Sequence, residues 1–483
     1  MPAARTDSDG ARPFPPAVYA AALRDTIVDA ALTGPMLHVL AFGGAYLTNF
    51  AKDLGATGTQ LGWLTTAGAL AMLAQFAASY VIERTGHRRR VALVSYLLAR
   101  AAWIPILILC MLPGLPTATR VWLLIAGVGI HQACQTAGGC GWLSWVRDLV
   151  PLAERGAYLA RRNQALQWAS VIAVFATAYL IDERQKTLGL QAYPGPLLTC
   201  ALLATSGLLW LRRVPEPPRP PSGWGEKSPR YRQLLVEALK DRDLRCMVAF
   251  QTLWTTAARL AAPFVQVYLR RTLGLSFVQI TLFQQLARAS NALQQRFWGP
   301  LIDRYGNRPV LVLSATILAV SGLLWLVVDR SNYWVCLPIL YLAQGAGNAG
   351  IGTSSTNQVL RLAPGGSPSV YLATFNAIAG LLSAIAPPLA GRLDDALGGQ
   401  RVRMGPFALL GVQILFVIQF VLRMGAVGMA AIVREPRAAR FGRFVRGLAR
   451  SSRRNPIAVS FRALLLYRRW RTVRRRRARQ RMP

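Results

Sequence analysis

The feature that most constrains this chain is a series of long apolar blocks. Eight of them contain no Asp, Glu, Lys or Arg: Thr59–Ile82, Val121–Val146, Asn163–Ile181, Gly195–Leu211, Pro309–Val328, Tyr333–Leu360, Ser369–Gly391 and Gly405–Leu422. Four more contain one or two charges: Thr26–Phe50, Val91–Leu112, Cys246–Leu269 and Leu275–Ile302. A helix needs about 20 apolar residues to cross a bilayer. The sequence therefore predicts an all-α membrane protein with twelve transmembrane helices.

Composition supports this prediction and excludes other classes. Only 16% of the 483 residues are charged, whereas a soluble domain has about 25%. The six cysteines lie in or beside apolar blocks without a CxxC pair, so we expect no disulfide framework, metal site or cofactor. HExxH and GxSxG motifs are absent from the sequence, so an enzyme is not expected. The first 25 residues lack the pattern of a cleavable signal peptide.

Of the 56 Lys and Arg residues behind the formal charge of +36, the largest groups lie in the C-terminal tail and the central linker. With twelve spans, a cytoplasmic N-terminus places both of these segments in the cytoplasm, as the positive-inside rule requires. We expect a multi-pass protein of the plasma (inner) membrane with both termini inside. After Val433 the tail holds 18 Arg and one acid, Glu435. Basic amphipathic helices of this kind bind anionic lipid. RNA binding by Arg474–Arg481 is the alternative interpretation of the tail. We favour lipid binding and therefore expect no nucleic acid partner.

Two halves are separated by a proline-rich segment. Six prolines lie within Pro215–Pro229, a composition typical of an extended linker. The predicted parts are an N-terminal arm, a six-helix half, a linker, a second six-helix half and a basic tail, at residues 1–25, 26–213, 214–245, 246–433 and 434–483. We expect a monomer.

The halves repeat one another in sequence. The loop after the second span has Glu83, Arg84, Gly86 and Arg88, and the loop after the eighth has Asp303, Arg304, Gly306 and Arg308, 220 residues later. A second match has an offset of 213: Pro151, Tyr158-Leu159-Ala160 and Asn163 correspond to Pro364, Tyr371-Leu372-Ala373 and Asn376. Two matches at nearly equal offset indicate a tandem duplication with pseudo-symmetric halves.

From Thr26 to about Val433 the chain resembles the major facilitator superfamily of transporters. The second loop, with Gly299 at its start, fits that family's G-x-x-x-D-R-x-G-x-R signature at every position, whereas the first has Ser79 and Glu83 instead of Gly and Asp. The resemblance implies that these loops latch the halves on the cytoplasmic side. We also expect Gly299 to let a neighbouring helix approach closely, and Asp148 to pair with the Glu83 loop.

The resemblance further implies that spans 1, 4, 7 and 10 line a central cavity. Their midpoints hold His38, His131, Arg259 and Asn348, with Gln135 near His131 and Arg288 on span 8. Arginines without nearby acids favour an anionic or polar substrate; the alternative is that they hydrogen-bond backbone carbonyls or face neighbouring helices. The histidines are candidate proton carriers, or else ordinary hydrogen-bonded core residues.

The function predicted from these features is secondary transport of a small polar solute, with an anion favoured, by alternating access and with proton coupling. The alternative is a non-transporting sensor or scaffold that acts through its basic tail.

Overall fold

The structure is a computed structural model that describes residues 14–41, 43–112, 114–217, 240–362, 375–376, 378–397, 400–404, 407–436, 438–439 and 442–444. It divides into two compact units. Unit 1 contains Met1–Ser228, Thr255–Leu282 and Gly380–Gln419, and unit 2 contains Pro229–Trp254, Phe283–Ala379 and Phe420–Pro483. The units do not coincide with the two halves predicted from sequence, because two segments of the second half belong to unit 1.

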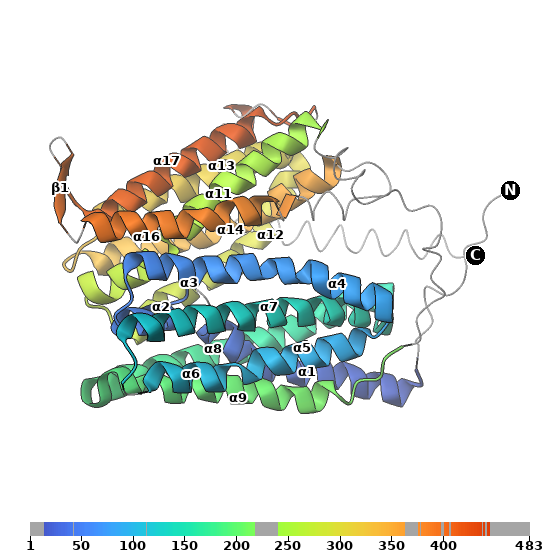
Figure 1. The fold of residues 1–483 in the computed structure, drawn as a ribbon. Helices are drawn as coiled ribbons and strands as arrows, with labels where there is room; N and C mark the ends of the chain where they lie inside the picture. The colour runs from blue at the N-terminus through green and yellow to red at the C-terminus, as the bar shows by residue number, and fades with distance from the viewer. Residues whose placement is uncertain are drawn as a thin grey trace. The chain divides into compact units, whose positions relative to one another are not determined.

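Helices account for nearly all the regular structure in the described residues (Figure 1). In the first half they are α1 (Pro16–Val39), α2 (Ala45–Asp53), α3 (Gly58–Leu70), α4 (Ala74–Thr85), α5 (Arg88–Ala101), α6 (Trp103–Met111), α7 (Thr117–Leu149), α8 (Leu152–Leu188) and α9 (Pro194–Leu211), with short 3-10 turns η2 (Ala71–Leu73) and η3 (Gly189–Ala192).

The second half continues the pattern. Its helices are α11 (Arg242–Val267), the π-helical turn η4 (Tyr268–Thr272), α12 (Phe277–Tyr305), α13 (Asn307–Ser321), α14 (Tyr333–Leu362), α16 (Ala386–Leu397) and α17 (Gly411–Ile432), with 3-10 turns η5 (Gly322–Leu326) and η6 (Ser383–Ile385). The strands β1 (Arg401–Met404) and β2 (Phe407–Leu410) form one antiparallel hairpin, with Arg401 opposite Leu410.

Six described helical stretches are both long and apolar enough to cross a bilayer: Gly58–Ile82, Arg88–Ile108, Tyr158–Ala192, Pro194–Leu211, Asn307–Leu326 and Gly411–Ile432. Five further helices, α1, α7, α11, α12 and α14, have 24 to 33 residues each. At 1.5 Å per residue, they are also long enough to span the hydrocarbon core. They include the helices on which the candidate polar residues lie.

Two predicted spans are wrong in detail. The first, Thr26–Phe50, is two helices, because α1 ends at Val39 and α2 starts at Ala45; Gly43 in the break has φ +71°, which favours glycine. The twelfth starts at Gly411 rather than Gly405, since residues 407–410 pair in the hairpin. A short apolar run does not distinguish strand from helix.

Helix α17 also ends later than the predicted span. It runs to Ile432, so it includes Arg423, which lies outside that span. Arg423 is 8% exposed, donates a 3.3 Å hydrogen bond to the carbonyl of Leu318, and lies 5.2 Å from the Trp254 ring centre. A guanidinium is thus buried within unit 2, among α11, α13 and α17.

Unit 1 contains a close contact between helices of different halves: α3 packs along α16 (Figure 1). A Cβ added at Gly62 would lie 2.2 Å from the carbonyl oxygen of Pro387, and one at Gly391 would lie 2.1 Å from that of Gly58. Only glycine fits at these positions, as expected where helices pack by backbone contact in lipid. Thr66 Oγ1 adds a 2.6 Å hydrogen bond to the carbonyl of Ala384.

Candidate functional site

His131 and Gln135 lie one turn apart on α7. His131 is 5% exposed, and its Nδ1 lies 2.6 Å from the carbonyl of Ala99. A carbonyl oxygen only accepts hydrogen bonds, so Nδ1 carries the hydrogen and Nε2 is the atom that can gain a proton. The imidazole lies 5.2 Å from the Trp103 ring, centre to centre. The Oε1 atom of Gln135 is buried with no hydrogen-bond donor among the described residues.

A buried ion pair lies close to His131. Arg100 on α5 donates a 3.0 Å hydrogen bond to Asp29 on α1, and their side chains are 1% and 3% exposed. The same guanidinium donates to the carbonyl of Ala204 on α9, and Thr33 donates to Asp29 at 3.3 Å. The pair therefore joins α1, α5 and α9. The sequence analysis did not predict this pair, although opposite charges within apolar spans are a usable signal.

His38 and Arg259 also bond to backbone carbonyls. His38 is half-buried near the end of α1, with Nδ1 3.1 Å from the carbonyl of Gly34. Arg259 on α11 is partly exposed and donates a 2.8 Å hydrogen bond to the carbonyl of Gly380. This contact is of the kind that the alternative interpretation of the arginines expected. Within the described parts of the chain, no acid forms an ion pair with Arg259.

Arg288 and Asn348 lie in unit 2, on α12 and α14. Both side chains are exposed. A polar side chain near the middle of a spanning helix is costly to expose to lipid. The four candidates His38, His131, Gln135 and Arg259 belong to unit 1.

Each of the two signature loops has a glycine with positive φ at its turn. Gly86 ends α4 with φ +72°, and Gly306 precedes α13 with φ +92°. Both angles fall in the left-handed region, so glycine is needed for the turn at each position. A Cβ at Gly306 would also lie 2.9 Å from that of Ala438.

The first signature loop is held by acids on other segments. Arg88 is 4% exposed and forms an ion pair with Asp148, which confirms the expected pairing of Asp148 with this loop. Its Nε also lies 3.6 Å from the carboxylate of Glu216. Arg84 is exposed, with Nη1 3.4 Å from the Tyr80 hydroxyl, and Glu83 lies on α4.

The second signature loop is also held by an acid on another segment, but through its backbone N–H groups. Glu435 accepts hydrogen bonds from the backbone N–H of Asn307 at 3.2 Å and of Arg308 at 2.7 Å, so it caps α13. Glu435 follows Glu216 by 219 residues and has the same place after the last helix of its half. In the sequence Glu435 was notable only as the single acid of the tail. Its role could not be predicted, because its partners are backbone N–H groups rather than a basic side chain that the sequence would reveal.

The expected close helix approach at Gly299 is not found within unit 2, because a Cβ at this position would meet no described atom within 4 Å. Asp303 and Arg304 are exposed on α12, and the Arg304 guanidinium lies 5.1 Å from the ring centre of Tyr305.

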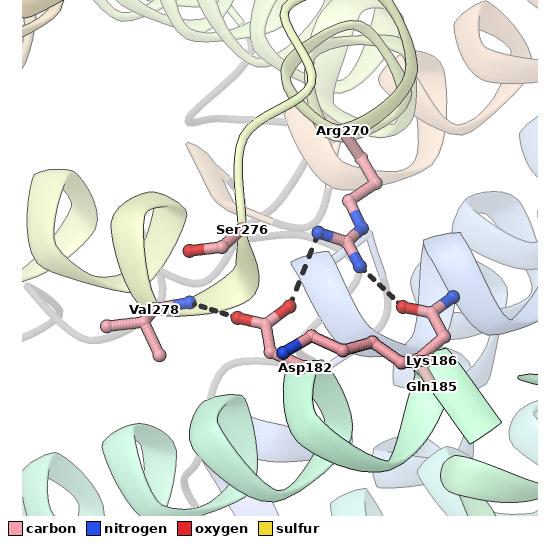
Figure 2. A pocket seen from close by; sticks show the side chains of 6 residues that line it. All are labelled: Asp182, Gln185, Lys186, Arg270, Ser276 and Val278. Carbon is pink, nitrogen blue, oxygen red and sulfur yellow. Dashed lines mark hydrogen bonds and ion pairs between the residues drawn. The ribbon is translucent and has the colours of Figure 1, made fainter. Parts of the chain in front are cut away.

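An open pocket of about 510 Å³ lies in unit 1, lined by Asp182, Gln185, Lys186, Arg270, Ser276 and Val278 (Figure 2). Asp182 and Arg270 form a 3.3 Å ion pair across it, and Arg270 also donates to Oε1 of Gln185. Asp182 lies beyond the charge-free span Asn163–Ile181, so the sequence analysis did not select it. The pocket brings α8 of the first half together with the α11–α12 connection of the second.

Comparison with known proteins places this architecture in a family. The profile of the Major Facilitator Superfamily matches residues 30–293 and 255–479. No curated protein matches the chain in sequence.

Solved structures with the same fold include a mutant form of the nucleoside transporter NupG, with a TM-score of 0.67, 13% identity and coverage of 86% of this chain and 100% of that one. A D-xylose–proton symporter has a TM-score of 0.63 and 14% identity, with coverage of 86% and 98%. A bacterial metal transporter has a TM-score of 0.58 and 12% identity, with coverage of 86% and 97%. The fold is that of membrane transporters rather than enzymes, and the chain belongs to the Major Facilitator Superfamily.

Proposed function

We propose that this protein is a proton-coupled secondary transporter that moves a small polar solute, preferentially an anion, by alternating access of its two halves. The observation that carries the anionic preference is the distribution of charge within the spans. Asp29 is the only acid in the predicted spans, and it is already paired with Arg100. Among the described residues Arg259 forms a single backbone contact, which leaves other guanidinium donors for a carboxylate or phosphate.

The exposed polar residues of unit 2 support a water-filled path. Arg288 and Asn348 would be costly to expose to hydrocarbon, so an aqueous cavity is the favourable environment for them. For proton coupling, His131 and His38 are the candidate carriers. In each of them Nδ1 lies next to a backbone carbonyl, and in His131 Nε2 is the atom that can accept the proton.

We propose that the protein is a monomer in the plasma (inner) membrane with both termini cytoplasmic, and that its basic tail binds anionic lipid. Residues 445–483 of that tail lie outside the described residues. Phe444, just before them, is fully buried against Trp298, Ile302 and Val310 of unit 2, so the start of the tail is anchored.

A ligand-stabilisation screen on the purified protein tests the substrate class. Carboxylates, phosphates, sugars, amino acids and organic cations are each added, and the melting temperature is measured. We expect anions to raise it, because a ligand that binds only the folded state stabilises that state by mass action. The rise should vanish in Arg259→Ala and persist in the control Arg296→Ala, which removes an exposed arginine that also bonds a backbone carbonyl. A rise caused only by cations would show that the anionic preference is wrong.

A further inference from the structure

Two helix starts in unit 1 have the same capping pattern. At α3, Thr57 and Gln60 exchange hydrogen bonds between side chain and backbone at 3.2 and 3.0 Å. At α12, Ser276 and Gln279 do the same at 3.1 and 2.9 Å. These are capping boxes, and they lie 219 residues apart. Each box leaves further backbone N–H groups at its helix start without an intrahelical acceptor.

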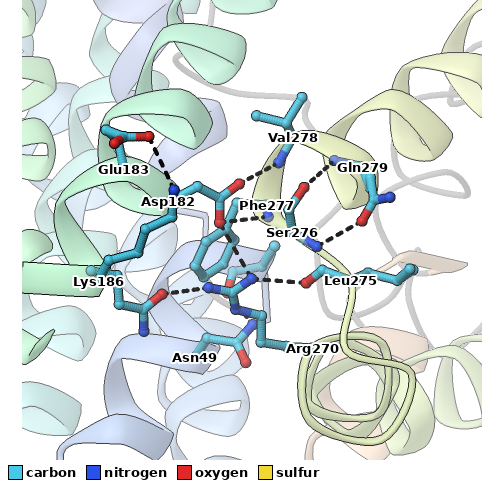
Figure 3. Close-up of polar contacts among 12 residues, drawn as sticks. Asn49, Asp182, Glu183, Lys186, Arg270, Leu275, Ser276, Phe277, Val278 and Gln279 are labelled. Atoms are coloured by element: carbon cyan, nitrogen blue, oxygen red, sulfur yellow. Dashed lines mark hydrogen bonds and ion pairs between the residues drawn. The ribbon is translucent and has the colours of Figure 1, made fainter.

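An aspartate from the other half accepts those N–H groups at α12. The two carboxylate oxygens of Asp182, at the far end of α8, accept from the backbone of Phe277 at 2.9 Å and of Val278 at 3.0 Å (Figure 3). Arg270 lies on the same carboxylate at 3.3 Å and donates a 2.8 Å hydrogen bond to the carbonyl of Leu275. The negative charge thus lies at the positive end of the α12 dipole.

The same arrangement recurs at α3 with the halves exchanged. Asp395, on α16 of the second half, accepts from the backbone N–H of Gly58 at 2.5 Å and of Thr59 at 2.8 Å, and from the Thr59 hydroxyl at 2.7 Å. Burial opposes the charged form, but these hydrogen bonds outweigh it and lower the pKa of Asp395 below its ordinary value. The carboxylate therefore stays ionised at neutral pH.

The two aspartates are related by the internal repeat. Asp395 follows Asp182 by 213 residues, which is the offset of the second repeat in the sequence. Each aspartate lies on one half and caps a helix of the other. The capped ends of α3 and α12 are also remote from the signature loops, because Gly86 and Gly306 lie at the opposite ends of the same spans.

We infer that Asp182 and Asp395 are the paired closing contacts of one gate, at the membrane face opposite to the signature loops, and that they break together when the transport path opens to that face. This inference rests on the proposed alternating access. Carboxylate–amide bonds suit a reversible gate, because water can replace each partner when the contact opens. The open pocket at Asp182 and Arg270 leaves room for water at this seam (Figure 2).

Amide hydrogen exchange of the whole protein in lipid nanodiscs tests the gate without any substrate. We expect Asp182→Ala to accelerate exchange about fivefold at residues 277–279, since it removes a helix cap. The distinguishing result is a comparable acceleration at residues 58–60, which the substitution does not touch. The reciprocal variant, Asp395→Ala, should accelerate exchange at 277–279 as well as at 58–60.

The matched control is Asp329→Ala. Asp329 accepts hydrogen bonds only within its own loop in the described structure, from Ser331 and Asn332, so neither capped segment should respond. Unchanged exchange in α5, which neither substitution touches, confirms that each variant is folded. If each substitution affects only the helix that it caps, the aspartates are independent caps and the paired gate is wrong. Hydrogen exchange is measured without transport, so independent caps would refute the paired gate and leave the proposed transport function untouched. Coupled exchange in a protein that transports no solute would refute the transport function and leave the paired gate.

Discussion

Replacing Asp29 by leucine is expected to destabilise the protein by about 3–5 kcal/mol, because it leaves a buried arginine without its counter-charge. Arg100 is 1% exposed, and its Nε atom has no hydrogen-bond acceptor among the described residues. The Asp29 carboxylate is therefore the main compensation for burying this guanidinium. Thermal unfolding in one detergent at one scan rate measures the effect, since membrane-protein melting depends on both.

The double variant Asp29→Leu with Arg100→Leu separates pairing from packing. Replacing both members of a buried ion pair by apolar groups is often neutral, so the double variant should melt much closer to the wild type than Asp29→Leu does. Lys186→Leu is the control, because it removes an ion pair with Glu183 whose side chains are 72% and 62% exposed; such pairs contribute little. A double variant as unstable as Asp29→Leu would contradict the electrostatic explanation.

Gly62→Leu is expected to have the second large effect, because α3 and α16 meet there through their backbones. Even the first carbon of the new side chain would lie 2.2 Å from the Pro387 carbonyl oxygen, so the helices must separate. Overpacking typically costs about 1–3 kcal/mol, and loss of the Thr66–Ala384 hydrogen bond adds to it. We expect a lower melting temperature and faster amide exchange at residues 58–66.

Gly428→Leu is the matched control for Gly62→Leu. Gly428 is an exposed glycine on α17, and an added Cβ would meet no described atom within 4 Å. It should therefore melt like the wild type. Equal destabilisation by both substitutions would mean that a general effect of adding a leucine side chain, rather than the α3–α16 contact, determines the result, since leucine forms helix better than glycine.

Much of the fold was predictable because lipid imposes a simple rule on the sequence. Apolar blocks of spanning length located the helices, and the repeated Gly86 and Gly306 marked turns with positive φ. Details that depend on tertiary contacts were not predictable. The hairpin at residues 401–410 delays α17, and an apolar run such as Phe407–Leu410 carries no periodicity that reveals this.

The site was predicted less completely than the fold, for a physical reason. His131, Arg259 and their neighbours were recognisable as polar groups within apolar helices. Asp182, Asp395 and Glu435 were missed because they lie outside the spans and bind backbone N–H groups. A backbone donor is present at every non-proline residue, so the sequence contains no partner residue to recognise.

Counterflow in proteoliposomes tests the central claim, transport by alternating access, most directly. Vesicles are loaded with the anion that best stabilises the protein, and uptake of the labelled anion from outside is followed. We predict saturable uptake that is stimulated by an inward proton gradient and lost in Arg259→Ala. Uptake should persist when residues 450–483 are removed, a deletion that retains the buried Phe444. An absence of uptake, together with a cellular phenotype that survives Arg259→Ala and disappears with that deletion, would contradict transport and favour a sensor or scaffold.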